Sequence, residues 1–158
     1  MRLPGFERKQ GTSRGDPLTS GTSPASNDDL SLSFIVITTD EEFHATLRQI
    51  AGACEWRIGR VASVEEVGSL INATPTPMVV YDRDSTEDNW CDAVRLLSDL
   101  PAHPCVLLAS PVADNYLLDE VVRNHGYDIL PKSVASERLI QCLRFAWSWA
   151  RTCGHTRR

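Results

Sequence analysis

Residues 78–82 read Met-Val-Val-Tyr-Asp. The residues before Asp82 are apolar or aromatic without interruption, which is typical of a short strand that is buried on both of its faces. Strands of this kind belong to parallel sheets that helices cover on both sides. The carboxylate of Asp82 ends the run, and a polar segment follows at 83–89. This stretch therefore predicts an α/β fold with an acidic side chain at the end of a buried strand.

The pattern of a short apolar run followed by a helical stretch recurs on both sides of 78–82. The other predicted strands are Phe34–Ile37, Trp56–Val61, Cys105–Ala109 and Tyr127–Leu130. The stretches after the strands carry apolar residues at helical spacing, as Phe43, Leu47 and Ile50 do after the first strand. Five strand–helix repeats predict a flavodoxin-like (βα)5 fold, which is a doubly wound parallel sheet with the strand order 2-1-3-4-5.

Local signals predict where the first and last helices begin and end. Thr39 and Glu42 have the T-x-x-E spacing of a capping box, and Gly52 is expected to end the helix that follows them. Ser136 is expected to cap the last helix, which should run to about Arg151.

The composition divides the chain into a tail and one domain. From Gly11 to Asn27 the sequence is mostly Gly, Ser, Thr and Pro, and such a segment buries too little apolar surface to offset its ordering entropy. We therefore expect a disordered tail at 1–30, a folded domain at 31–152 and a basic C-terminal end at 153–158. No output domain is expected beside the folded one.

Charge and cysteine content argue against several classes of protein. The formal net charge of −5 disfavours a general nucleic-acid binder, and no apolar run is long enough to span a membrane. The five cysteines are scattered without a C-x-x-C pair, which disfavours a zinc site or a disulfide framework and fits a reduced cytoplasm. The histidines are isolated in the sequence and are expected to be neither catalytic nor metal-binding: His44, His103, His125 and His155.

Polar side chains follow the predicted strands at the edge where sites form in doubly wound sheets, beyond the carboxyl ends of the strands. The set comprises Thr38, Thr39, Asp82, Ser110 and Lys132. A carboxylate in this set could attack a phosphoryl group and form an acyl phosphate. The ammonium could neutralise one phosphoryl oxygen, and the serine hydroxyl could donate a hydrogen bond to another.

The strand ends resemble those of response-regulator receiver domains of the CheY-like family. The resemblance covers Ser33 to about Trp149 and rests on Val79–Asp82, Leu107–Ser110 and Tyr127–Lys132. It implies that Asp82 is the phospho-acceptor and that Ser110 and Lys132 contact the phosphoryl group. Segments around 82–90 and 125–130 also resemble a group of short, stand-alone bacterial receiver-like proteins.

The acidic pocket that the resemblance implies is degenerate. Receivers have two adjacent acids after the first strand that hold Mg²⁺, whereas Thr38 and Thr39 stand there in this chain. Asp40 could assist Asp82 in binding Mg²⁺, but its other interpretation is that it complements the start of the helix. We expect Mg²⁺ to bind weakly or not at all, and no other cofactor. The switch aromatic of receivers is replaced by Ile129.

Two functions remain open on this evidence. The first is a stand-alone receiver-like module of a two-component phosphorelay that accepts a phosphoryl group on Asp82 from a histidine kinase or another phosphodonor. The alternative is a phosphorylation-independent pseudo-receiver that serves as an interaction or dimerisation module. Neither is an enzyme in the usual sense, and no catalytic residue is assigned.

The last helix carries two apolar stripes. One is expected to face the sheet and contains Leu139, Leu143, Ala146, Trp147 and Ala150. Phe145 and Trp149, four residues apart, lie on a second stripe and form a candidate interface for a homodimer or another partner. The other interpretation is that the tail or the preceding helix covers this stripe.

Overall fold

The computed structural model describes residues 32–73, 78–85 and 89–156 of the chain. The strands are β1 (Ser33–Ile37), β2 (Arg57–Val61), β3 (Met78–Asp82), β4 (Cys105–Ser110) and β5 (Asp128–Pro131). The helices are α2 (Glu41–Cys54), α3 (Val64–Ala73), α4 (Trp90–Ser98), α5 (Asn115–Arg123) and α6 (Ser136–Thr156). Each predicted strand is present within one residue of its expected start and end. The expected tail at 1–30 lies outside the described residues.

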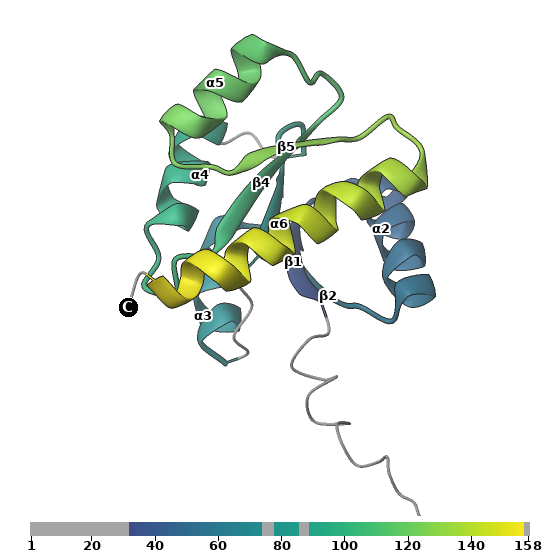
Figure 1. The fold of residues 1–158 in the computed structure, drawn as a ribbon, viewed down its shortest axis with the longest axis horizontal. Coiled ribbons are helices and arrows are strands. Elements are labelled where there is room, and N and C mark those ends of the chain that lie inside the picture. Colours follow the sequence, from purple (N-terminus) through teal and green to yellow (C-terminus); the bar gives the residue numbers. More distant parts are fainter. Residues whose placement is uncertain (1–31, 74–77, 86–88, 157–158) are drawn as a thin grey trace, which may run out of the picture. The chain divides into compact units, whose positions relative to one another are not determined.

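The five strands form one parallel sheet in the order β2-β1-β3-β4-β5 (Figure 1). The register places Val36 opposite Val80, and Val80 in turn opposite Leu107. The prediction of a flavodoxin-like sheet with the order 2-1-3-4-5 is therefore confirmed. Because all strands point the same way, the residues after β1, β3, β4 and β5 gather at one edge of the sheet.

The helices cover both faces of the sheet and divide the core into two clusters. Phe34 and Val36 of β1 pack in a cluster with residues of α2 and α6, the helix that crosses in front of the sheet in Figure 1. Ile35 and Ile37 pack in the other cluster with residues of α3, α4 and α5. β3 is buried along its whole length, as its uninterrupted apolar sequence predicted.

Two expected helix ends are wrong. Helix α2 continues past Gly52 to Cys54, and Glu55 then takes the left-handed conformation with φ of 61°. A glycine inside a helix costs only about 1 kcal/mol relative to alanine, so it does not by itself end one. Helix α6 continues beyond Arg151 to Thr156.

Candidate functional site

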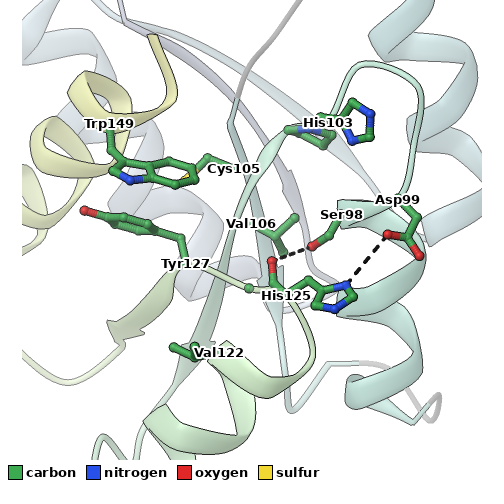
Figure 2. Close-up of a pocket in the computed structure, with 11 residues that line it drawn as sticks. Ser98, Asp99, His103, Cys105, Val106, Val122, His125, Tyr127 and Trp149 are labelled. Atoms are coloured by element: carbon green, nitrogen blue, oxygen red, sulfur yellow. Dashed lines mark hydrogen bonds and ion pairs between the residues drawn. The ribbon is translucent and has the colours of Figure 1, made fainter. Parts of the chain in front are cut away.

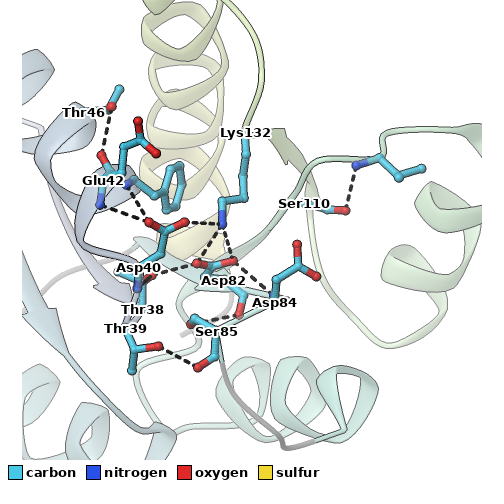
Figure 3. Close-up of polar contacts among 12 residues, drawn as sticks. Thr38, Thr39, Asp40, Glu42, Thr46, Asp82, Asp84, Ser85, Ser110 and Lys132 are labelled. Atoms are coloured by element: carbon cyan, nitrogen blue, oxygen red, sulfur yellow. Dashed lines mark hydrogen bonds and ion pairs between the residues drawn. The ribbon is translucent and has the colours of Figure 1, made fainter.

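The polar residues singled out in the sequence meet at the carboxyl edge of the sheet (Figure 3). Asp82 is the last residue of β3 and Ser110 the last of β4, while Thr38 and Lys132 each follow the end of a strand by one residue. Asp82, Thr38 and Ser110 are completely buried. The strand ends thus bring a carboxylate, hydroxyls and an ammonium into the interior of this edge.

Asp82 has a partner on every side of its carboxylate. Lys132 Nζ lies 3.0 Å from both Oδ1 and Oδ2. The Thr38 hydroxyl donates to Oδ2 at 2.7 Å, and the backbone N–H of Asp84 donates to Oδ1 at 3.2 Å. A carboxylate offers about four acceptor positions, and these contacts occupy them.

Lys132 connects Asp82 to a second carboxylate. Its ammonium also donates to Asp40 Oδ2 at 3.0 Å, and it lies 4.8 Å from the centre of the Phe43 ring. Burial by itself would lower the pKa of Lys132. The hydrogen bonds and charges of Asp40 and Asp82 outweigh burial and raise the pKa above its ordinary value of 10.5. Lys132 is therefore held in its charged form.

Asp40 is the N-cap of α2. Its Oδ1 accepts the backbone N–H groups of Glu42 at 3.0 Å and Phe43 at 3.1 Å. The Phe43 hydrogen bond and then Lys132 lower the pKa of Asp40 below its ordinary value of 3.8. Asp40 thus complements the helix start, as one of the two interpretations held. The capping box expected from Thr39 is wrong, because the Thr39 hydroxyl donates instead to the carbonyl of Ser85 at 2.8 Å.

The two pKa shifts predict how stability depends on pH. The lowered pKa of Asp40 gives a contribution that is present above pH 3.8 and is lost as the pH falls through the folded-state pKa. The raised pKa of Lys132 gives a contribution that is present below pH 10.5 and is lost at higher pH. When urea unfolding is measured across pH, the free energies of unfolding of the wild type and Asp40→Asn should differ by a constant amount between these limits. The difference should shrink in acid, and one that persists in strong acid would contradict the pairing.

Ser110 is buried at the end of β4, but its side-chain hydrogen bond is made to the following loop and not to Asp82. Its hydroxyl oxygen accepts the backbone N–H of Val112 at 3.1 Å, as Figure 3 shows. In the register of β3 with β4, Asp82 lies opposite Ala109, so Ser110 is one residue beyond it. Ile129, at the position of the switch aromatic, is buried in the core cluster of α3, α4 and α5.

The donor set does not fit a divalent cation. Asp82 has its acceptor positions occupied, and Asp40 uses one oxygen for the helix cap and the other for Lys132. The hydroxyls of Thr38 and Thr39 donate to other groups. No group of three or more His, Cys, Asp or Glu side chains in the described part of the chain is placed to hold a metal ion. The expectation of weak or no Mg²⁺ binding stays a prediction.

A cleft of about 440 Å³ opens above this cluster. Its lining includes three acidic residues, Asp40, Glu42 and Asp84, together with Lys132. Asp82 and Ser110 do not line it. The cleft is therefore acidic, and Lys132 and Asp40 form the boundary between it and the buried carboxylate of Asp82.

A second cavity, of about 620 Å³, lies beside the start of β4 and the residues that precede β5 (Figure 2). His125 lies in it with Nδ1 3.8 Å from Asp99, and the Ser98 hydroxyl donates to the His125 carbonyl at 2.9 Å. His103 is a further lining residue. His125 is distant in sequence from Ser98, Asp99 and His103, so no local sequence pattern could have grouped it with them.

Helix α6 buries one of its two stripes and exposes part of the other. Leu139, Leu143, Ala146 and Ala150 are buried and Trp147 packs against them, which confirms the predicted core stripe. Phe145 is 63 % exposed. Trp149 is 37 % exposed and packs on Tyr127, with ring centres 4.9 Å apart. Phe145 therefore presents a larger exposed fraction than Trp149.

No family model and no curated protein matches the chain, but solved structures share its fold. The chemotaxis protein CheY4 of Vibrio cholerae is 9 % identical, with a TM-score of 0.66 over 73 % of this chain and 98 % of that one. The beryllofluoride-activated NtrC4 receiver domain dimer is 14 % identical, with a TM-score of 0.66 over 75 % and 98 % of the chains.

A third similar structure is the receiver domain of the Saccharomyces cerevisiae response regulator Ssk1, in complex with the histidine phosphotransfer protein Ypd1. That match has 9 % identity and a TM-score of 0.64, over 75 % of this chain and 90 % of the matched one. Within the described residues, no helix is long and apolar enough to cross a membrane. The order of its strands and these structural matches show that the chain has the fold of a CheY-like response-regulator receiver domain.

Proposed function

We propose that this chain is a receiver-fold signalling module that acts through protein–protein contacts without phosphorylation of Asp82. One observation carries the proposal: the carboxylate of Asp82 is completely buried, and Thr38, Lys132 and the Asp84 backbone occupy its acceptor positions. A carboxylate attacks a phosphoryl group through an oxygen lone pair. Phosphorylation of Asp82 would therefore require that at least one of these partners be displaced.

The charge of the cleft supports the same proposal. Its lining carries the carboxylates of Asp40, Glu42 and Asp84 and the single ammonium of Lys132, which already pairs with Asp40 and Asp82. A phosphoryl group carries up to about two negative charges. Without a further cation, these carboxylates would repel the incoming group.

The second candidate is the phospho-acceptor that the resemblance implies. It is favoured by the gathering of Asp82, Ser110 and Lys132 at one edge of the sheet, beside a cleft. In this candidate Lys132 and Ser110 would turn to the phosphoryl oxygens, and a histidine kinase or another phosphodonor would be the partner. One similar receiver is bound to a histidine phosphotransfer protein, which is consistent with such a partner.

Treatment of the full chain with acetyl phosphate and Mg²⁺ separates the two candidates. We expect intact-mass spectrometry to find no phosphoryl adduct on the wild type, because the lone pairs of Asp82 are engaged and Thr38 and Thr39 replace the acid pair. The variant Thr38→Asp/Thr39→Asp, which restores that pair, is the matched comparison. An adduct that forms on the wild type and is absent from Asp82→Asn would favour the phospho-acceptor.

We propose that the contacts of the module are made through α6. Phe145 is largely exposed. Trp149, four residues further along the helix, is 37 % exposed and packs on Tyr127. Aromatic residues are enriched at the centres of protein interfaces. A second copy of this chain is the partner we favour, and one of the structural matches is itself a receiver dimer.

A further inference from the structure

We infer that the ammonium of Lys132 is the permanent cation of this pocket, taking the place of a bound divalent ion and connecting α2, β3 and β5 directly. The inference rests on the proposed function, because a pocket that takes no phosphoryl group and contains its own cation needs no bound metal to balance its carboxylates. It goes further by assigning that role to one side chain.

The ammonium is surrounded by carboxylate oxygens. Its nitrogen lies 3.0 Å from each of three of them: Asp40 Oδ2, Asp82 Oδ1 and Asp82 Oδ2. The two oxygens of Asp82 belong to one carboxylate and share one donor proton, while Asp40 accepts another. The ring of Phe43 lies 4.8 Å from the nitrogen. The side chain is only 13 % exposed, so water contributes little to its solvation. Lys132 is thus held by groups of the protein rather than by solvent.

The two carboxylates need a cation between them. Asp82 is fully buried, and one nitrogen lies 3.0 Å from oxygens of both Asp40 and Asp82, so these negative charges are held close together. Isolated charges in a protein interior are strongly unfavourable, and like charges at short range repel. If Lys132 were removed, the carboxylates of Asp40 and Asp82 would lose the cation that they share, and oxygen ligands of this kind suit a hard divalent cation.

The same contacts join parts of the chain that are distant in sequence. Asp40 caps α2, Asp82 ends β3, and Lys132 follows β5 and precedes α6. The pairs are separated by 92 and 50 residues. One side chain of the protein therefore joins the start of α2 to the ends of β3 and β5 without a diffusible ion.

Titration of the full chain with Mn²⁺, followed by paramagnetic broadening in backbone amide NMR spectra, tests the inference. The amides of Glu42, Phe43 and Asp84 donate to the two carboxylates and are the nearest reporters. In Lys132→Ala these signals should disappear at a Mn²⁺ concentration at least about tenfold lower than in the wild type. In Lys132→Ala/Asp40→Asn the broadening should be lost again.

Arg60→Ala is the matched control. It removes a cation from a nearby ion pair with Glu41, where a single carboxylate is the partner, and should leave the Mn²⁺ response as in the wild type. Lys132→Met retains an apolar stem over Phe43 and replaces the alanine variant if that one fails to fold. If neither variant folds, the wild type is judged alone: reporter signals that persist to millimolar Mn²⁺ support the inference, and signals that disappear at micromolar Mn²⁺ overturn it.

Two outcomes would overturn the inference. One is a wild type that loses the reporter signals at the same Mn²⁺ concentration as the Lys132 variant. The other is a folded Lys132 variant whose reporter signals are not broadened by Mn²⁺. The acetyl phosphate experiment reports separately on the proposed function. A wild type that binds Mn²⁺ as tightly as the Lys132 variant but takes no phosphoryl group would refute only the inference, and one that takes a phosphoryl group would refute the proposed function.

Discussion

Replacement of Lys132 by methionine is expected to lower the free energy of unfolding by about 3–5 kcal/mol, the range found when one partner of a buried ion pair is removed. The Asp82 carboxylate is fully buried, and it would lose its only ammonium partner among the described contacts. Methionine has a similar length, so packing against Phe43 changes little and the loss reports mainly on charge. Urea unfolding monitored by tryptophan fluorescence measures the difference.

The variant Lys132→Met/Asp82→Asn is the test of this explanation. Removal of the uncompensated charge should restore part of the lost stability, because an amide is far less costly to bury than a carboxylate. Asp82→Asn alone leaves Lys132 paired with Asp40 and should be less harmful than Lys132→Met. If Lys132→Met cost less than about 1 kcal/mol, the pair would behave like an exposed salt bridge, and its assigned role would be wrong.

The strands could be predicted because their signals are local, and their order because repeated strand–helix units form doubly wound sheets. The run from Val79 to Tyr81 is apolar at every position, and β3 is buried at every position. Such a run has no polar face, so a strand covered on both sides is the arrangement that suits it. Helix ends were less predictable, since Gly52 lowers helix propensity without preventing the hydrogen bonds that continue α2 to Cys54.

The candidate site could be located from the sequence, but its contacts could not. Strand ends predicted that Asp82 and Lys132 would lie at one edge, because parallel strands share that edge. Thr39 was expected to cap α2, but threonine and aspartate are both good N-caps and the two residues are adjacent. Asp40 is the cap, and its second oxygen thereby faces Lys132. This contact joins residues 92 positions apart, and no short sequence pattern encodes it.

Helix α6 permits a comparison between its buried and its exposed stripe. Leu143→Ala should lower the free energy of unfolding by about 2–5 kcal/mol, because Leu143 is completely buried against the sheet and its loss leaves a cavity. Phe145→Ser should change it by no more than about 0.5 kcal/mol, as expected for an exposed position away from special contacts. Urea unfolding of both variants measures these effects.

Substitutions in the exposed stripe of α6 should weaken association of the chain with a second copy. If α6 forms the homodimer that we propose, Phe145→Ser should shift the full chain from dimer to monomer in sedimentation velocity while its unfolding remains as in the wild type. The double variant Phe145→Ser/Trp149→Ser should shift it further, but Trp149 also packs on Tyr127, so the single variant separates association from folding more cleanly. A wild type that stays monomeric at high concentration would exclude the homodimer. Destabilisation by Phe145→Ser as large as that by Leu143→Ala would show that this side chain belongs to the core.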